Sequence, residues 1–276
     1  MITESLIRRF CDTLFEKEYA AATIQKYTGT IRELKTFAGE QPLTKSMLLS
    51  FREVMKQKYK AQTVNGKLSA INVFLDYMGV SDMRLKLLRV QRRAFVEEYR
   101  ELSRDEYRRL LGAAKDRGDD RLYHVMIAIC GTGIRISELK YITVEAVRNG
   151  RAEISMKGKE RLLLIPKALK NKLLQYAARN KIFQGCLFIT KNKKPLDRSN
   201  IWHDMKRLCQ AARVNEQKVF PHNLRHLFAR SFYAIEKNIA HLADILGHSN
   251  IETTRIYVAA SARTCKRTMD KMQLVI

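Results

Sequence analysis

Four segments near the start of the chain repeat apolar residues every three or four positions, which is the spacing of an amphipathic helix. Gly39 and Gly79 follow the second and fourth segments as end signals, and Thr44 and Thr63 are candidate N-caps of the third and fourth. The pattern therefore predicts a small helical domain over residues 1–83. Its apolar positions are Leu6, Phe10 and Leu14; Ile24, Tyr27, Ile31 and Leu34; Leu48, Phe51 and Met55; and Val64, Leu68, Ile71, Leu75 and Met78.

The helical period fades between residues 84 and 100, where basic side chains accumulate, and we expect a basic interdomain linker there. Ser103 and Glu106 then stand at the spacing of a capping box, which opens a second domain over residues 101–276. This domain is predicted to be helical apart from two strands, 152–156 and 161–166, around a glycine-containing turn. The predicted fold class is mainly α with a small β-hairpin.

The charge balance narrows the choice of binding partner. The chain of 276 residues carries 52 Lys and Arg against 28 Asp and Glu, a formal net charge of +24, and both predicted domains are basic. Such an excess favours a polyanionic partner that offsets the self-repulsion, and nucleic acid is the first to consider.

Composition also excludes several classes of protein. The longest apolar stretch, residues 125–130, is far shorter than the roughly 20 residues that span a bilayer, and the N-terminus lacks the pattern of a signal peptide. We therefore expect a cytoplasmic protein without a membrane partner. The 5 cysteines are widely separated and form no CxxC pair, so neither a disulfide scaffold nor a metal site is predicted.

Four short motifs carry candidate chemistry. They contain Arg135 and Glu138 in a glycine turn that leads into a helix, Lys157 and Lys159 at the hairpin tip, His222 and Arg225 one turn apart after a proline, and His248 followed by Tyr257. Each motif alone has an ordinary structural explanation, such as a solvated charged turn, a paired surface arginine or a half-buried aromatic residue.

Taken together and in this order, the motifs resemble those of the tyrosine recombinase family, which includes the phage integrases and the Xer-type site-specific recombinases. The strings that carry the resemblance are residues 133–139, 222–226 and 246–248, and it covers nearly the whole chain. It implies a SAM-like core-binding domain joined to a catalytic domain, together forming a C-shaped clamp around DNA. It further implies a cofactor-free enzyme that carries out site-specific recombination, for integration, excision or resolution. The expected partner is double-stranded DNA with paired inverted core sites, on which the protein forms a homotetramer that holds two DNA sites.

The residue types suit this chemistry. Attack on an anionic phosphodiester needs charge neutralisation, an in-line nucleophile and a proton for the leaving oxygen. The planar guanidinium groups of Arg135 and Arg225 can each contact the two non-bridging oxygens.

The remaining roles follow from the resemblance. It implies that Tyr257 is the nucleophile, which forms a 3′-phosphotyrosyl bond before strands are exchanged through a Holliday junction, and that His222 is its general base. Lys157 would protonate the 5′-oxygen, His248 would bind the phosphate or orient the tyrosine, and Glu138 would hold the arginine and histidine in place.

Two assignments around the hairpin are less direct. The tip is one residue shorter than the commonest family form, so the catalytic lysine is Lys157, which directly precedes the glycine, or alternatively Lys159. We expect Lys159, Arg161, Arg92 and Arg93 to contact DNA.

Two other functions remain open at this point. A type IB topoisomerase uses similar groups to nick and relax DNA, although the four-helix N-terminal region argues against it. A non-catalytic DNA-binding protein would explain the charge but not the ordered set of catalytic residue types.

The apolar and basic C-terminal tail either closes its own domain or docks on a neighbouring protomer.

Overall fold

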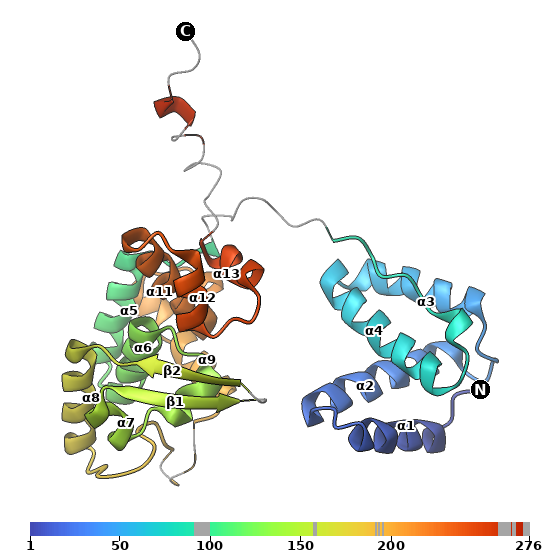
Figure 1. Ribbon diagram of the computed structural model, residues 1–276, viewed down its shortest axis with the longest axis horizontal. Helices are drawn as coiled ribbons and strands as arrows, with labels where there is room; N and C mark the ends of the chain where they lie inside the picture. Colours follow the sequence, from blue (N-terminus) through green and yellow to red (C-terminus); the bar gives the residue numbers. More distant parts are fainter. Residues whose placement is uncertain are drawn as a thin grey trace. The chain divides into compact units, whose positions relative to one another are not determined.

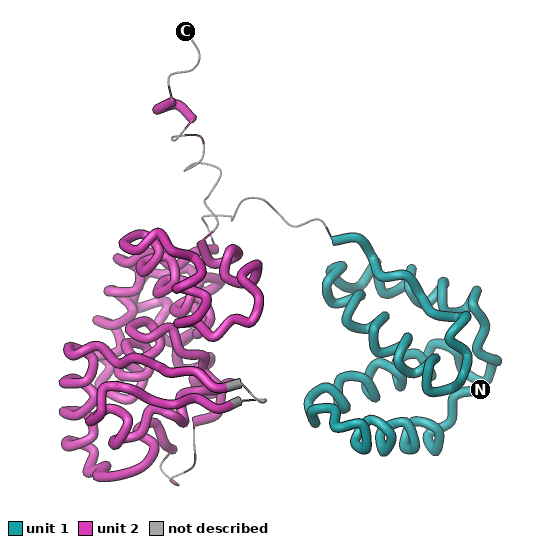
Figure 2. Tube along the Cα trace, in the orientation of Figure 1, with its two compact units in different colours: residues 1–92 teal, residues 93–276 magenta. Residues whose placement is uncertain are grey.

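The computed structural model describes residues 1–90, 100–156, 159–190, 192, 194, 196–258, 266 and 269–272. The chain forms two compact units, Met1–Arg92 and Arg93–Ile276 (Figure 2). Both consist mainly of helices, and the described residues contain a single two-stranded antiparallel sheet, so the predicted fold class is confirmed.

The first unit consists of helices packed around one hydrophobic core (Figure 1). Most of its predicted apolar positions are buried, but Tyr27 and Met78 are only partly buried, and Ile7 replaces Leu6 in the core of the first helix. Phe10 meets Phe74 edge to face, with ring centroids 5.1 Å apart. The helices are α1 (Glu4–Glu16), α2 (Ala21–Ala38), α3 (Lys45–Lys58), α4 (Ala61–Tyr77) and the 3-10 helix η1 (Ser81–Met83).

Of the two N-caps predicted in this unit, the structure forms one and not the other. Thr44 caps α3 as predicted, because its hydroxyl accepts a hydrogen bond from the Met47 amide at 3.2 Å. The predicted cap at Thr63 is wrong, because α4 begins two residues earlier and has Lys60 at its N-cap without a side-chain hydrogen bond.

Two asparagines of α4 bind the segment that follows η1. Asn72 pairs with both backbone groups of Leu85 at 2.8 and 2.9 Å, and Asn65 pairs in the same way with Leu88 at 2.7 and 2.9 Å. Leu85 is buried in the core of the first unit. The segment up to Leu88 therefore packs on this unit. The rest of the predicted linker includes residues 91–99, which lie outside the described residues, and the linker stays a prediction.

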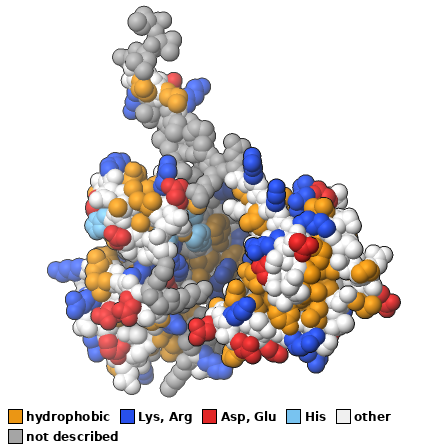
Figure 3. Space-filling view, turned by 45° about the vertical axis from the view of Figure 1, so that its right-hand side comes forward, with side chains coloured by type: hydrophobic (Ala, Val, Ile, Leu, Met, Phe, Trp, Pro, Cys, Tyr) orange, Lys and Arg blue, Asp and Glu red, His pale blue; other side chains and the backbone are white. Residues whose placement is uncertain are grey.

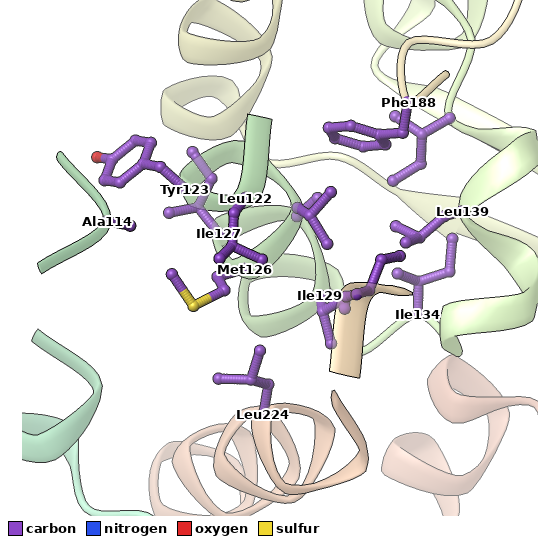
Figure 4. Packing of buried hydrophobic residues seen from close by; sticks show 14 of the residues in the cluster. Ala114, Leu122, Tyr123, Met126, Ile127, Ile129, Ile134, Leu139, Phe188 and Leu224 are labelled. Atoms are coloured by element: carbon purple, nitrogen blue, oxygen red, sulfur yellow. The ribbon is translucent and has the colours of Figure 1, made fainter. Parts of the chain in front are cut away.

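The second unit is built around α6, which is buried along most of its length. Met126 of α6 packs toward Leu224 of α11, while Ile134, Leu139 and Phe188 extend the same core (Figure 4). The described elements are α5 (Arg104–Asp116), α6 (Asp120–Thr132), η3 (Ile136–Tyr141), α7 (Val144–Asn149), β1 (Arg151–Met156), β2 (Lys159–Leu164), α8 (Lys167–Arg179), α9 (Arg198–Lys206), α10 (Cys209–Ala212), η4 (Glu216–Lys218), α11 (Pro221–Ile235), α12 (Ile239–Leu246) and α13 (Ile251–Val258).

Local signals in this unit agree with the structure. The capping box at α5 forms both of its bonds, from the Ser103 amide to Glu106 at 2.7 Å and from the Glu106 amide to Ser103 at 3.1 Å. Pro221 occupies the first turn of α11. The hairpin pairs residues 151–156 with 159–164 in antiparallel register, so its second strand begins and ends two residues before the predicted 161–166. None of the helices in the described ranges combines the length and apolarity that a membrane span requires.

A glycine makes the turn that leads from α6 to Arg135. Gly133 ends α6 at φ +66°, and a Cβ atom built on it would lie 2.4 Å from the ring of Phe228. Only glycine combines this left-handed backbone with such a close approach. The turn brings Arg135 to the start of η3, close to the ends of α11 and α12.

Candidate active site

Three arginines converge on the C-terminal end of α12. The last carbonyls of a helix have no intrahelical partner and carry partial negative charge, so cationic donors are stabilised there. Three successive carbonyls each accept one arginine: Ile245 from Nη1 of Arg161 at 2.5 Å, Leu246 from Nη2 of Arg225 at 2.7 Å, and Gly247 from Nη2 of Arg135 at 3.0 Å.

Arg225 is the most deeply buried of these groups, with 1% of the residue exposed. Besides Leu246, it donates to the carbonyl of Gly133 at 2.5 Å and lies 2.9 Å from Nε2 of His248. Burial, followed by the nearby charge of Arg135, lowers the pKa of Arg225 to about 10, so it remains cationic at neutral pH. Its buried Nε has no hydrogen-bond partner among the described residues.

Arg135 is held by a carboxylate one helical turn away. Its Nη1 donates to Oε1 of Glu138 at 2.7 Å, and its backbone amide donates to Oε2 at 2.9 Å. Burial alone would raise the pKa of Glu138, but the hydrogen bonds from Arg135 and the charge of Arg161 outweigh it, and the pKa is lowered. The side chain of Arg135 is 38% exposed. Glu138 therefore fixes its orientation while the guanidinium stays accessible to a substrate.

His248 is oriented by two hydrogen bonds that fix its tautomer. Arg225 can only donate, so Nε2 of His248 is the acceptor, and Nδ1 carries the proton that it donates to Oγ1 of Thr254 at 2.8 Å. Burial and the charges of Arg225 and Arg135 lower the pKa of His248 to about 4. The imidazole is therefore neutral at pH 7.

Tyr257 lies on α13 with 5% of the residue exposed. Its hydroxyl lies 3.1 Å from Nε2 of His222, and its ring stacks on His226 with centroids 4.1 Å apart and planes 22° apart. The guanidinium of Arg225 lies 6.0 Å from the centroid of the tyrosine ring. The predicted nucleophile, its predicted base and one predicted phosphate-binding arginine are thus brought together.

The protonation state of His222 suits a base. Partial burial and the charges of Arg225 and Arg135 lower its pKa, although the residue as a whole remains exposed. A neutral imidazole at pH 7 can accept a proton from the tyrosine hydroxyl, whereas an imidazolium cannot.

The lysine of the site is not placed by the structure. Lys157 lies outside the described residues, as do Arg92 and Arg93. The backbone of Lys159 lies in β2 opposite Met156, and its side chain is outside the described set. The choice between the two lysines stays a prediction, and so does DNA contact by Lys159, Arg92 and Arg93.

Arg161 takes a different place from the predicted DNA contact. Its side chain is 10% exposed and forms an ion pair with Oε2 of Glu138, in addition to the bond to Ile245. The alternation along β2 directs it into the unit together with the buried Leu163, while Leu162 and Leu164 are exposed. We therefore revise the expectation that Arg161 faces DNA.

A cleft of about 680 Å³ opens beside these groups. One wall comes from the turn that carries Arg135 and another from the exposed face of α9, so the predicted phosphate-binding groups border an accessible space. Its lining includes Arg135, His222, Arg225, Arg198, Ser199 and Trp202. Within the described ranges, no three His, Cys, Asp or Glu side chains gather as a metal-binding group.

Sequence reasoning missed two contributors to this site. His226 stands in the motif that contains His222, but no function had been assigned to it, and Thr254 had not been considered. The spacing of three between Thr254 and Tyr257 puts them near one another on a helix, which is a weak signal. That Thr254 orients His248 could not be predicted from the sequence, because it depends on a tertiary contact.

Both units of the chain match known protein families. The phage integrase family matches residues 100–263, and the phage integrase N-terminal SAM-like domain matches residues 7–79. Tyrosine recombinase XerA of Thermococcus kodakarensis is 29% identical over 263 residues, which cover 92% of this chain and 90% of that protein. Tyrosine recombinase XerD of Vibrio cholerae is 23% identical over 286 residues, which cover 96% and 94%.

Solved structures share the fold. The Tn1549 transposon integrase in complex with transposon right end DNA superposes with a TM-score of 0.72 at 16% identity, covering 98% of this chain and 99% of that one. A lambda integrase tetramer bound to a Holliday junction gives a TM-score of 0.73 at 16% identity, covering 92% of this chain and 76% of that one.

Proposed function

The chain belongs to the phage integrase family and is a site-specific tyrosine recombinase, and from that premise we propose that Tyr257 is the nucleophile of its DNA cleavage. The observation that carries this assignment is the hydroxyl of Tyr257 at 3.1 Å from Nε2 of His222, beside the buried guanidinium of Arg225. A nucleophile within hydrogen-bond reach of a neutral base is the geometry that such catalysis requires.

In the proposed cleavage step the Tyr257 oxygen attacks phosphorus while its proton passes to Nε2 of His222. The bond from phosphorus to the 5′-oxygen breaks, and Lys157 or Lys159 donates a proton to that oxygen. The products are a 3′-phosphotyrosyl ester and a free 5′-hydroxyl. Because the phosphodiester is exchanged for another ester, rejoining to a partner strand reverses these steps and needs no ATP.

Electrostatics support the roles of the arginines. A pentavalent phosphorane accumulates negative charge on its non-bridging oxygens, and preorganised donors stabilise it without a reorganisation cost. Arg225 and Arg135 are preorganised because each is tied to a carbonyl of α12, and Arg135 is tied to Glu138 as well. Since Nε2 of His248 already accepts from Arg225, the proposed role of His248 is to orient that arginine and, through it, the phosphate.

We propose that the partner is double-stranded DNA with paired inverted core sites. The net charge of +24 supports this, and many Lys and Arg side chains are visible on the face of the molecule that Figure 3 shows. We further propose a homotetramer on two DNA sites, supported by the tetramer that lambda integrase forms on a Holliday junction.

A suicide-substrate assay tests the proposal. Selection of bound duplexes from a random pool first identifies the core site. A nick beside the scissile phosphate then lets a short fragment diffuse away, so that cleavage is trapped as a covalent protein–DNA adduct. Adduct formation at Tyr257, mapped by peptide analysis, and Holliday-junction formation on a two-site substrate are expected. A protein that binds the site without forming an adduct contradicts the assignment.

A further inference from the structure

Arg161 connects the predicted lysine hairpin to the centre of the candidate site. It lies on β2, four residues after Lys157 and two after Lys159. Nη1 donates to the carbonyl of Ile245 in α12, and Nη2 forms an ion pair with Glu138 of η3. One side chain therefore bridges three elements that are distant in sequence.

The contact with α12 extends along the stem of the arginine. Gly247 follows α12 with φ +64°, and a Cβ atom built there would lie 2.3 Å from Cδ and 2.8 Å from Nε of Arg161. The absence of a side chain at Gly247 lets the backbone after α12 pack directly on Arg161. The same glycine carbonyl accepts a hydrogen bond from Arg135.

Energetics argue that this contact serves placement more than stability. A buried ion pair loses much of its attraction to desolvation, and a well-packed apolar side chain often stabilises a fold equally well. What an apolar residue cannot supply is directed hydrogen bonding to both a carboxylate and a helix carbonyl, which fixes where β2 lies against η3 and α12.

The other arginines have hydrogen bonds in which Arg161 takes no part. Arg135 has two bonds to Glu138 and one to Gly247, and Arg225 has its bond to Leu246. We therefore expect loss of the Arg161 guanidinium to loosen β2 against η3 and α12 more than it displaces Arg135 and Arg225.

We propose that Arg161 is a positioning residue that fixes the lysine hairpin against the arginine site, so that the general acid and the phosphate-binding groups reach the same phosphate together. This rests on the proposed function, in which a lysine of the hairpin protonates the leaving oxygen. It assigns to Arg161 an effect on proton delivery in place of the DNA contact expected from sequence.

The test compares Arg161→Met and Arg161→Lys with wild type on two suicide substrates. One carries an ordinary phosphodiester, and the other carries sulfur at the 5′-bridging position, which leaves without protonation. We expect Arg161→Met to cleave the ordinary substrate about a hundredfold more slowly, the scale of a misplaced catalytic group. The sulfur substrate should recover most of that loss, because proton delivery is bypassed. Arg161→Lys, which keeps the charge, should fall between them.

Matched measurements separate this effect from its alternatives. Arg151 lies on β1 at the opposite end of the hairpin and is exposed, so Arg151→Met controls for loss of a basic residue. Thermal unfolding and gel shift on a single site are measured for every variant. Recovery on the sulfur substrate with retained binding supports the proposal even if the melting temperature falls, since a folding defect slows both substrates equally.

Two outcomes overturn the proposal. Equal losses on both substrates with binding retained would mean that Arg161 does not act through proton delivery, and a loss of binding that accounts for the loss of cleavage would restore the DNA-contact role. Failure of the proposed function gives a different result, because wild-type protein would then form no adduct at Tyr257 on either substrate.

Discussion

The hydroxyl of Tyr257 and Nε2 of His222 lie 3.1 Å apart, although the two residues are separated by 35 positions in the sequence. The tyrosine stands on α13 and the histidine in the first turn of α11, so the pair depends on the packing of these helices. The tyrosine ring also stacks on His226, while its oxygen faces His222.

Tyr257→Phe should abolish covalent adduct formation while site binding stays within about twofold of wild type, because the phenyl ring keeps its stacking area and only the nucleophilic oxygen is lost. Adduct is measured by denaturing gel electrophoresis on the suicide substrate, and binding by gel shift. A mutant that still forms adduct would move the nucleophile elsewhere.

Arg135→Ala and Arg225→Ala should each lose about 3 kcal/mol or more of transition-state stabilisation, measured as the rate of single-turnover cleavage. Their effects on stability should differ. Arg225 is fully buried and its removal leaves two carbonyls without donors, whereas Arg135 is partly exposed. Thermal unfolding should show the larger decrease for Arg225→Ala. Normal cleavage by either variant would place phosphate binding outside this site.

The histidines of the site predict a loss of stability in acid. Burial lowers the pKa of His226 to about 3 and, with the charge of Arg225, that of His248 to about 4, against an ordinary value of 6.5. Between these values the unfolded chain binds more protons than the folded one, so the free energy of unfolding should decrease as the pH falls from 6.5 toward 4.

Chemical denaturation across that pH window measures this slope. His226→Asn should reduce it, while His241→Asn, at an exposed position on α12, serves as the control. The lowered pKa of Glu138 acts in the same direction, since its stabilising charge is lost as the pH falls. An unchanged slope in His226→Asn would show that its imidazole is protonated in the folded protein.

The identity of the general acid is tested with the substrate that carries a 5′-bridging sulfur. We expect the sulfur to rescue Lys157→Ala and to give little benefit to Lys159→Ala, because only the residue that protonates the leaving oxygen becomes dispensable. The rate of adduct formation is the readout. The opposite pattern assigns the role to Lys159.

Deletion of residues 265–276 tests how the C-terminal tail is used. If the tail docks on a neighbouring protomer, the truncated protein should bind a half-site normally but lose cooperative binding to a full site and recombination. Gel-shift titration of both sites beside a recombination assay measures this. Cooperativity and recombination that survive the deletion exclude exchange of the tail, and a general loss of solubility favours a tail that closes its own domain.

Local sequence signals determined much of this protein. Helical periodicity places Phe10, Leu34 and Phe51 in the core, and the capping box at Ser103 starts α5, because each depends on residues within a few positions of one another. The motifs that contain the candidate catalytic residues could likewise be recognised in the sequence, since motif spacing is a property of the chain.

Contacts between distant segments were decided only by tertiary structure. The run Leu162, Leu163 and Leu164 does not reveal that the middle leucine alone is buried, and the basic hairpin does not reveal that Arg161 points inward. A charge in a sequence has no partner until folding brings one within reach. Arg161 meets Glu138, 23 positions away, and the carbonyl of Ile245, 84 positions away. Burial then makes these directed hydrogen bonds obligatory, because a desolvated guanidinium without partners is costly.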